Sequence, residues 1–264
     1  MPGEPENPTL AELMRRDWDA RARTDSFRYI YSDVPIASAE EFFGSGEADY
    51  GRYVEPVIAK LGFPAEGRTM LELGCGVGRM TRSFARRFRV VYALDISPEM
   101  LHQGRTLHPD FPNIVWMQGD GQGLAMFADT SLDFVFSFIV LQHMPTPQLG
   151  LNYVREMLRV LKPGGAFCFQ FNNRQAPTMN WRGRAVWKLL DRLREPVMGL
   201  KLQGVGAKLS LALGLDPLQA GRTWHGAVLD ASQLLETVRQ GGGVVQGMTG
   251  GGTQAAWCHG RKTG

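Results

Sequence analysis

The sequence predicts an α/β protein built on a doubly wound, seven-stranded and mostly parallel sheet whose last strand is antiparallel. Short apolar segments typical of buried strands alternate with segments whose apolar residues recur every three or four positions, as on one face of a helix. The first strand leads directly into a glycine-rich turn and a helix start. The chain has 264 residues, 44% of them hydrophobic, which allows one such domain with added segments.

The N-terminal segment, residues 1–62, is predicted to form a helical extension. Thr9 and Glu12 have the spacing of a capping box, and a helix with an apolar face follows them. A second helical region runs from about residue 45 to residue 61 and is interrupted or restarted at Pro56. We therefore expect helices, and no strand, before the sheet begins.

The alternating part of the chain predicts a core of residues 63–171 and 225–264. The seven expected strands are residues 69–73, 90–95, 113–118, 132–140, 166–171, 244–248 and 254–259. The helices expected between them start near residues 79, 97, 147 and 231. Residues 172–224 interrupt the alternation after the fifth strand, so we expect them to form a helical insert on the substrate side.

The glycine turn after the first strand is the best candidate for a binding site. Gly74, Gly76 and Gly78 read G-x-G-x-G, and Arg79 stands where a dinucleotide fingerprint has its third glycine. NAD, a nucleotide phosphate and another adenosyl ligand all remain open on the turn alone, as does a structural turn without a ligand. Glu72 just before the turn would receive a pyrophosphate poorly and a cation well.

Two motifs in this region resemble those of a known family. The segment E-L-G-C-G-V-G-R at residues 72–79 resembles motif I of class I S-adenosylmethionine-dependent methyltransferases, and L-K-P-G-G at residues 161–165 is a second mark of that family. The resemblance covers residues 66–171 strongly and 225–262 loosely. It implies a Rossmann-like core, S-adenosyl-L-methionine as the cofactor, S-adenosyl-L-homocysteine as the product, and transfer of a methyl group to an O, N or S atom of a small molecule.

The resemblance also implies which residues meet the cofactor. Asp95, at the end of the second strand and about 20 residues after the glycine turn, can accept both ribose hydroxyls. In the family an acid at the position of Asp120 meets the adenine amino group, although a turn residue is the other interpretation. Cys75 contacts the cofactor through its backbone and is not expected to be a nucleophile. The full expected set is Glu72, Gly74, Cys75, Gly76, Arg79, Asp95, Ile96, Met100, Asp120, Gly121, Ser137 and Phe138.

Two histidines are candidates for handling the acceptor's proton. The methyl group of a sulfonium is already activated, so positioning of donor and acceptor carries most of the chemistry, with a general base in some cases. His143 follows the fourth strand and is the first candidate, and a structural role is the competing interpretation. His225 is the second candidate. His102 and His108 are expected at the surface.

Aromatic residues outside the core are candidates for a lid over the site. Tyr29 and Tyr31 belong to an aromatic cluster that we place outside any long helix, and local packing is the alternative to a lid. Trp181 and Trp224 lie in the insert. Specificity in such proteins is carried by segments beyond the strand ends, so acceptor choice is expected in these regions.

Several classes of substrate, partner and compartment are disfavoured. Ser137 and Phe138 stand where methyltransferases of nucleic-acid amines have an N/D-P-P-Y/F motif, and the net charge is only +3, so no nucleic acid is expected. Three scattered cysteines make no metal pattern, and no metal is expected. Without an apolar run long enough for a membrane span, we expect a cytoplasmic protein, and a homodimer remains open.

Two other functions compete with methyl transfer. An NAD(P)-dependent oxidoreductase is disfavoured by the G-x-G-x-G spacing. A cofactor-holding scaffold is the other, because residues 172–224 contain nine Lys/Arg and three Asp/Glu beside an apolar stripe that suits a membrane surface or a partner. A packed lid helix with a solvated face explains the same stripe.

Overall fold

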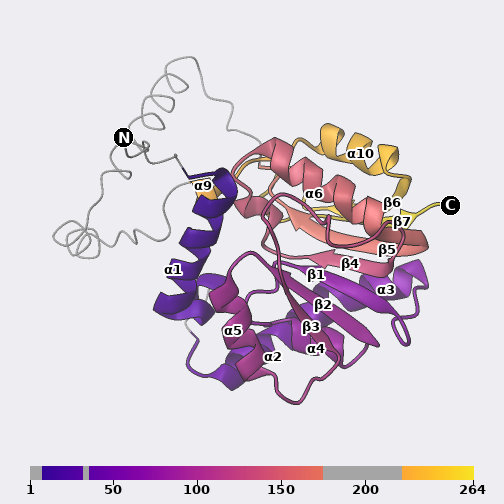
Figure 1. Ribbon diagram of the computed structural model, residues 1–264. Helices are drawn as coiled ribbons and strands as arrows, with labels where there is room; N and C mark the ends of the chain where they lie inside the picture. The colour runs from indigo at the N-terminus through magenta and orange to yellow at the C-terminus, as the bar shows by residue number, and fades with distance from the viewer. Residues whose placement is uncertain (1–7, 32–35, 175–221) are drawn as a thin grey trace, which may run out of the picture.

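A seven-stranded sheet forms the centre of the protein, with strand order β3-β2-β1-β4-β5-β7-β6 (Figure 1). The computed structural model describes residues 8–31, 36–174 and 222–264. The strands are β1 (Thr69–Leu73), β2 (Val90–Asp95), β3 (Ile114–Gln118), β4 (Leu132–Ser137), β5 (Leu161–Phe171), β6 (Gly243–Thr249) and β7 (Ala256–Lys262). Strands β1 to β5 are parallel, and β7 pairs antiparallel with both β5 and β6. The predicted fold class is therefore confirmed.

Helices cover both faces of this sheet. They are α1 (Leu10–Ile30), α2 (Ala39–Asp49), the π-helix η1 (Tyr50–Val54), α3 (Glu55–Leu61), α4 (Thr81–Ala85), α5 (Pro98–Leu107), the 3₁₀ turn η2 (Leu141–His143), α6 (Pro147–Val160), α9 (Arg222–His225) and α10 (Ala231–Gln240). Helices α6 and α10 lie on one face, and α3, α4 and α5 lie on the other (Figure 1).

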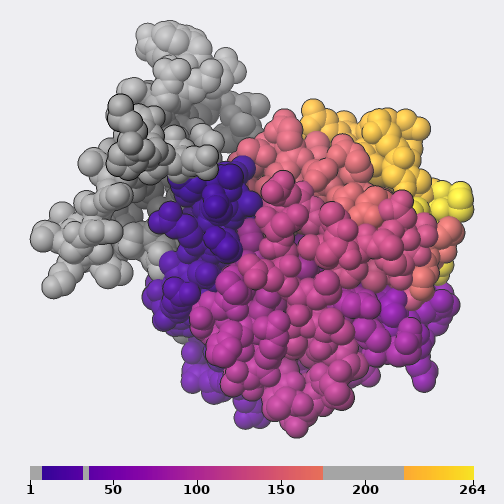
Figure 2. Space-filling model, in the orientation of Figure 1, coloured from indigo at the N-terminus to yellow at the C-terminus, as the bar shows by residue number. Residues whose placement is uncertain are grey.

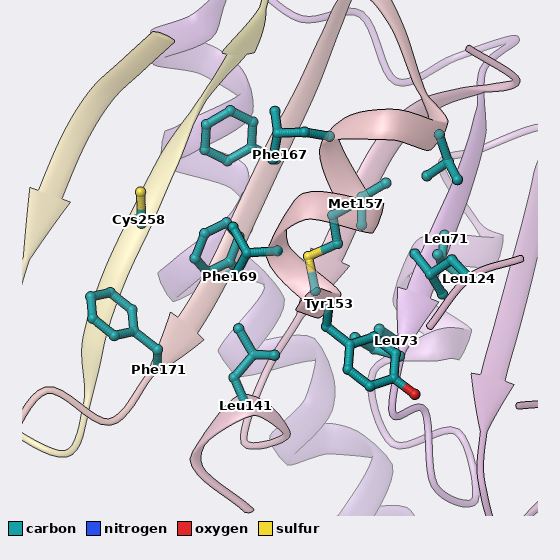
Figure 3. Packing of buried hydrophobic residues seen from close by; sticks show 14 of the residues in the cluster. Leu71, Leu73, Leu124, Leu141, Tyr153, Met157, Phe167, Phe169, Phe171 and Cys258 are labelled. Atoms are coloured by element: carbon teal, nitrogen blue, oxygen red, sulfur yellow. The ribbon is translucent and has the colours of Figure 1, made fainter. Parts of the chain in front are cut away.

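Side-chain alternation along the strands divides the core into two layers. Leu71 and Leu73 point toward α6, where they join Met157 and the β5 phenylalanines shown in Figure 3. Met70, one position away, points to the opposite layer with Phe84 and the aromatic residues of β4. Each fully buried side chain of this size stabilises the fold by roughly 1.5–3 kcal/mol. The same alternation directs Glu72 toward α4.

Helix α1 is longer than the sequence predicted. Its N-terminus has the expected capping box, in which Thr9 Oγ1 accepts from the Glu12 amide and Glu12 Oε2 accepts from the Thr9 amide. The helix continues past a kink at Asp25, whose φ is −169° and ψ 90°, so Tyr29 lies in its last turn and Tyr31 caps it. The expectation that these tyrosines lie outside a long helix is wrong, because burial of Tyr29 holds the turns after the kink in place.

Two predicted elements, a helical region and a strand, have different bounds in the structure. The helical region expected at 45–61 begins earlier, at Ala39 after the N-cap Ser38, and passes through η1 before α3. Strand β4 stops at Ser137, before the predicted residue 140, because Ile139 has a positive φ of 56° that no strand accommodates.

The proposed division of the chain is only partly visible. The predicted insert, residues 172–224, lies outside the described residues except at its two ends. The domain boundaries at 1–62, 63–171 with 225–264, and 172–224 remain predictions. The end of the insert that is described, in α9, contacts α1 rather than the far side of the sheet (Figure 1).

Candidate cofactor and acceptor site

The glycine turn has a backbone that only glycine adopts freely. Gly74, Gly76 and Gly78 have φ values of 74°, 56° and 89°. The amides of Gly74 and Cys75 both donate to the carbonyl of Leu94, at 2.7 and 3.0 Å, which ties the turn to the end of β2. A β-carbon on Gly74 would lie 2.0 Å from a methyl carbon of Val140. Glycine is therefore needed at this turn for its backbone conformation and, at Gly74, also because no side chain would fit.

Glu72 ends β1 as a buried carboxyl group. Its Oε2 accepts a hydrogen bond of 2.5 Å from the hydroxyl of Thr81, at the start of α4. Burial raises the pKa of Glu72 from its ordinary value of 4.5 to about 8, and the Thr81 hydrogen bond and the Arg79 charge only partly oppose this. The ligand-free site thus holds a protonated Glu72 at neutral pH that a cation would ionise.

Asp95 ends β2 and links the glycine turn to the start of α5. Its Oδ2 accepts from the Gly76 amide and its Oδ1 from the Ser97 amide, both at 2.9 Å. Burial raises the pKa of Asp95 to about 6, while those backbone donors lower it. The carboxylate still has lone pairs available, because each oxygen can accept more than one hydrogen bond.

Arg79 is paired with polar side chains of α2. Its Nη1 donates to Asp49 at 2.7 Å and to the hydroxyl of Ser45 at 3.1 Å, both on α2. The guanidinium lies 4.7 Å from the ring centre of Tyr31 and 5.7 Å from that of Phe138. Arg79 therefore braces the wall of the site, and Tyr31 packs against Arg79 from outside the cavity lining.

One continuous cavity joins these groups to the acceptor side. It is lined by Met14, Trp18, Tyr29, Ile30, Glu72, Leu73, Gly74, Cys75, Gly76, Arg79, Met80, Leu94, Asp95, Ile96, Met100, Gly119, Phe138, Ile139, Val140, His143, Met144 and Tyr153. One end carries the two acids and the bare glycine backbone. The other end is apolar and aromatic, with a single imidazole.

His143 lies at the acceptor end, inside an aromatic cluster. Its ring centre is 5.3 Å from that of Trp18 and 5.3 Å from that of Trp224. Its Nδ1 forms a short hydrogen bond with the backbone carbonyl of Trp224. The pKa of His143 is lowered to about 4, mainly by burial and also by the charges of Arg21 and His225, while the hydrogen bond with the Trp224 carbonyl partly opposes this. The imidazole is therefore neutral at pH 7.

The α9 segment reaches His143 because a glycine follows it. A β-carbon on Gly226 would lie 1.8 Å from the carbonyl oxygen of Gln142, so only glycine permits this approach. The next amide, of Ala227, donates to the Met144 carbonyl at 2.8 Å. The α9 segment is thus fastened to η2, which brings the Trp224 carbonyl to the imidazole.

Helix α1 covers the cavity, and Figure 2 shows it packed directly against the body of the domain. A β-carbon on Gly76 would lie 2.6 Å from the end of the Ile30 side chain. Asp19 accepts a 2.5 Å hydrogen bond from the hydroxyl of Ser97, the N-cap of α5. The ring centres of Tyr29 and Trp224 are 6.0 Å apart at 87°. Tyr29 therefore lines the cavity from α1 with Trp224 packed against it, Tyr31 and Trp224 lie outside the lining, and a lid role for these residues remains a prediction.

Three expected cofactor residues lie outside the cavity lining. Asp120 is exposed, and its Oδ1 accepts from the amides of Gln122 and Gly123 at 2.8 and 3.2 Å, which is the turn role. Ser137 is buried and donates to the carbonyl of Leu73 at 3.3 Å. Gly121 packs against Ile96 and α1. Contacts of these residues with a cofactor remain predictions.

The other candidates have more varied surroundings. Cys75 is buried, and burial raises the pKa of its thiol well above the usual range, so the expectation that it is no nucleophile fits its environment. His225 is exposed and lies outside the cavity lining, and Trp181 lies outside the described residues. His108 is not at the surface as expected: its Nε2 meets the Gly78 carbonyl at 2.9 Å in an aromatic pocket.

The sequence reasoning missed several residues at the acceptor end. Trp18 and Met14 were expected only on the apolar face of the first helix, and Tyr153 was given no role. All three line the cavity. The sequence did contain one indication of this site. Trp, Met and Arg residues are mixed on α1, and such a face is too polar and bulky for a helix that only packs on a core.

Two absences concern the residues that the structure describes. In residues 8–31, 36–174 and 222–264, no three His, Cys, Asp or Glu side chains come together in a way that could hold a metal ion. Within the same ranges, every helix is too short or too polar to cross a membrane.

The sheet order, the glycine turn after β1 and the acid ending β2 together define a Rossmann-like domain of the class I methyltransferase type. Residues 71–169 match the methyltransferase domain family, and this part of the chain is a class I S-adenosylmethionine-dependent methyltransferase domain. The resemblance given by the two motifs is confirmed, and with it S-adenosylmethionine as the cofactor of the family.

Individual relatives extend the match beyond the core. The 2-methyl-6-phytyl-1,4-hydroquinone methyltransferase of Synechocystis sp. is 26% identical over 241 residues, covering 83% of this chain and 74% of that protein. An uncharacterized methyltransferase of Mycobacterium marinum is 33% identical over 141 residues, and the chain spans 51% of that protein's length.

A solved structure supports the fold independently. Magnesium protoporphyrin IX methyltransferase from Synechocystis, with bound S-adenosylmethionine, is similar over 98% of this chain and 100% of that one, with a TM-score of 0.59 and 15% sequence identity. At that identity the similarity concerns the fold alone.

Proposed function

We propose that the chain transfers the methyl group of S-adenosylmethionine to an O, N or S atom of an apolar, ring-containing small molecule. The observation that carries this proposal is the cavity itself, which runs from two acids at the strand ends to an apolar end with one imidazole. A cationic, adenosyl-bearing ligand suits the first end, and a hydrophobic acceptor suits the second.

The residues of the cofactor end have distinct tasks. Glu72 faces the positive charges of the ligand and ionises to meet them, and Asp95 accepts the ribose hydroxyls while it keeps the Gly76 amide in place. The unsubstituted backbone of the glycine turn allows close approach. When bound, the cofactor supplies a methyl group that is already electrophilic, so orientation and exclusion of water are what the protein adds.

The acceptor end supports a ring-shaped substrate. Trp18, Met14 and Met144 offer flat or adaptable apolar surface, which packs well on a planar molecule. A relative whose name includes a hydroquinone supports the same class of acceptor. His143 lines this end of the cavity and is the histidine that the sequence offered first as a general base.

Calorimetry and a transfer assay test this proposal together. S-adenosylhomocysteine should bind in the micromolar range, worth about −8 kcal/mol, and NADH should not bind. Labelled methyl groups should then appear on one member of a panel of hydroquinones, phenols, aromatic carboxylic acids and amines. Binding of NADH without binding of S-adenosylhomocysteine would show that the oxidoreductase alternative is correct.

A further inference from the structure

A chain of side-chain amides ends at the imidazole of the acceptor site. It begins at Gln170 of β5, which is 1% exposed. The Oε1 atom of Gln170 accepts from the Ile139 amide at 3.0 Å, and its Nε2 donates to the Gln254 carbonyl at 2.5 Å. A backbone N–H can only donate and a backbone carbonyl can only accept, so these two groups determine which way the Gln170 amide faces.

The orientation of Gln170 determines that of Gln142. The Nε2 of Gln170 also donates to Gln142 Oε1 at 2.9 Å, so the Gln142 oxygen is turned toward β5. The Gln142 nitrogen is then the atom that faces His143, with 3.3 Å between the two Nε2 atoms. Because an amide nitrogen only donates, the Nε2 of His143 must be the unprotonated, accepting atom.

The second nitrogen of the imidazole is determined in the same way. Nδ1 of His143 meets the backbone carbonyl of Trp224, which can only accept, so Nδ1 carries the proton. Three backbone groups, at Ile139, Gln254 and Trp224, therefore specify one neutral tautomer.

We infer that Gln142 and Gln170 are positioning residues that hold His143 neutral, with Nδ1 protonated and Nε2 accepting from Gln142. Resting on the proposed function, the consequence is that both nitrogens of the imidazole are engaged by the protein, so His143 shapes the acceptor end of the cavity and does not take the acceptor's proton. Such a site suits an acceptor whose hydroxyl ionises without a strong base, such as a phenol or a carboxylic acid, better than an amine.

Protonation of the imidazole would break this arrangement. An Nε2–H would point at the N–H of Gln142, and relief of that contact would turn Gln142 and break its hydrogen bond with Gln170. Loss of Gln142 from its place would leave the buried Nε2 of Gln170 with only its Gln254 partner. The network therefore resists a second proton on His143 by geometry.

The charged groups around His143 act in the same direction. Arg21 of α1 and His225 of α9 both disfavour a positive imidazolium. Asp17 of α1 is engaged by the Thr223 hydroxyl at 2.6 Å. Tyr29 contacts the far side of Trp224. Burial is the largest cause that lowers the pKa of His143, to about 4, and only the hydrogen bond with the Trp224 carbonyl opposes it.

Nitrogen-15 NMR of histidine side chains in the ligand-free, full-length protein tests the inference. The His143 signals are assigned by their loss in His143→Gln. The wild-type protein should show a proton on Nδ1, an unprotonated Nε2, and no titration of His143 above about pH 5. A proton on Nε2, or titration near pH 6.5, overturns the inference.

Gln142→Glu is the sharpest variant. It keeps an oxygen for the Gln170 N–H but replaces the donor that faces Nε2 with an acceptor. The proton affinity of His143 should rise by about a hundredfold or more, which is roughly 2 pKa units. Gln142→Met is the matched control, since it removes the amide without adding charge and should give a smaller rise. Equal pKa values of His143 in the wild type and in Gln142→Glu would contradict the inferred network of Gln170, Gln142 and His143.

Gln170→Met tests the remote member, which does not touch His143. Release of Gln142 should raise the pKa of His143 and allow exchange between its tautomers on the NMR timescale. An unchanged tautomer in a folded Gln170→Met protein overturns the role of Gln170. If this variant fails to fold because Ile139 loses its partner, two measurements still test the inference. They are the tautomer of His143 in the wild-type protein and the comparison of Gln142→Glu with Gln142→Met. None of these measurements needs a cofactor, so failure of the proposed function would appear separately, as absent S-adenosylhomocysteine binding.

Discussion

The buried carboxyl group of Glu72 predicts that cofactor binding releases a proton. Glu72 lies at the cofactor end of the cavity, and burial raises its pKa to about 8, so most molecules hold it protonated at pH 7. A cationic ligand favours the ionised form, and binding must therefore expel that proton. The perturbation to apply is pH, combined with Glu72→Gln, which keeps a partner for Thr81 but cannot ionise.

The size of the effect follows from the pKa of about 8. If only ionised Glu72 binds the cofactor, the apparent affinity rises about tenfold between pH 7 and pH 9, which is about 1.4 kcal/mol, and then levels off. At pH 7 about 0.9 proton should leave for each cofactor bound. Asp95, with a pKa of about 6, contributes little in this range.

Calorimetry in buffers of different ionisation enthalpy measures both quantities. The cofactor has an amino group that titrates in the same range, and Glu72→Gln removes this complication because the ligand is identical for both proteins. The affinities of wild type and Glu72→Gln should converge near pH 6 and differ by about tenfold or more at pH 9. Parallel affinity curves, or no proton release at pH 7, would refute the assignment of Glu72.

The same shift predicts a pH dependence of stability. Glu72 binds a proton in the folded state up to about pH 8, whereas its ordinary pKa is 4.5. The folded state therefore binds more protons than the unfolded state between these values, and stability falls as pH rises through that window. Thermal melts of the ligand-free protein should show this fall between about pH 6.5 and 8, above the range in which Asp95 and the buried histidines His108 and His143 change stability, and Glu72→Gln should flatten it.

Three further substitutions test the site. Asp95→Ala should weaken S-adenosylhomocysteine binding at least tenfold in calorimetry. It should also lower stability by about 1–3 kcal/mol, because the amide of Gly76 loses its acceptor. Unchanged affinity in a folded variant contradicts the assignment of Asp95 to the cofactor site. Gly76→Val should abolish binding while Gly76→Ala retains more, since the larger side chain collides further with Ile30; normal binding by the valine variant argues against cofactor at this turn. Gly226→Ala should cost about 1–3 kcal/mol in denaturant unfolding, because its β-carbon would overlap the Gln142 carbonyl, and an unchanged midpoint contradicts tight docking of α9.

The parts of the fold that could be predicted are those encoded locally. The strand Thr69–Leu73, the helix over 231–240 and the glycine turn appear with the predicted bounds, because apolar runs, caps and glycines act within a few residues. Where a single backbone angle decides, prediction failed. The left-handed conformation of Ile139 ends β4 early, and nothing in an apolar run signals it, since isoleucine rarely adopts that conformation.

Long-range partners account for the other errors. His108 follows a polar helix and looks exposed, but it fills the space beside Gly78, together with Trp116, which is 5.5 Å away between ring centres. No residue close to His108 in the sequence indicates that Gly78 and Trp116 are its partners. The tautomer of His143 was even harder to predict from the sequence. It depends on the carbonyl of Trp224, 81 positions later in the chain, and on Gln170 of β5.

The two ends of the cavity differ in how they are encoded, and this explains why the cofactor was predictable and the acceptor was not. The cofactor end consists of residues at the ends of adjacent parallel strands, so Glu72 and Asp95 meet wherever β1 and β2 pair in register. The acceptor end is assembled from α1, η2 and α9, which share no local pattern and meet only through contacts such as that between Trp18 and Trp224. Substitutions on those three segments can change the acceptor while the cofactor end stays intact. Acceptor specificity should therefore follow residues such as Trp18 of α1, which lines the cavity and lies outside the sheet.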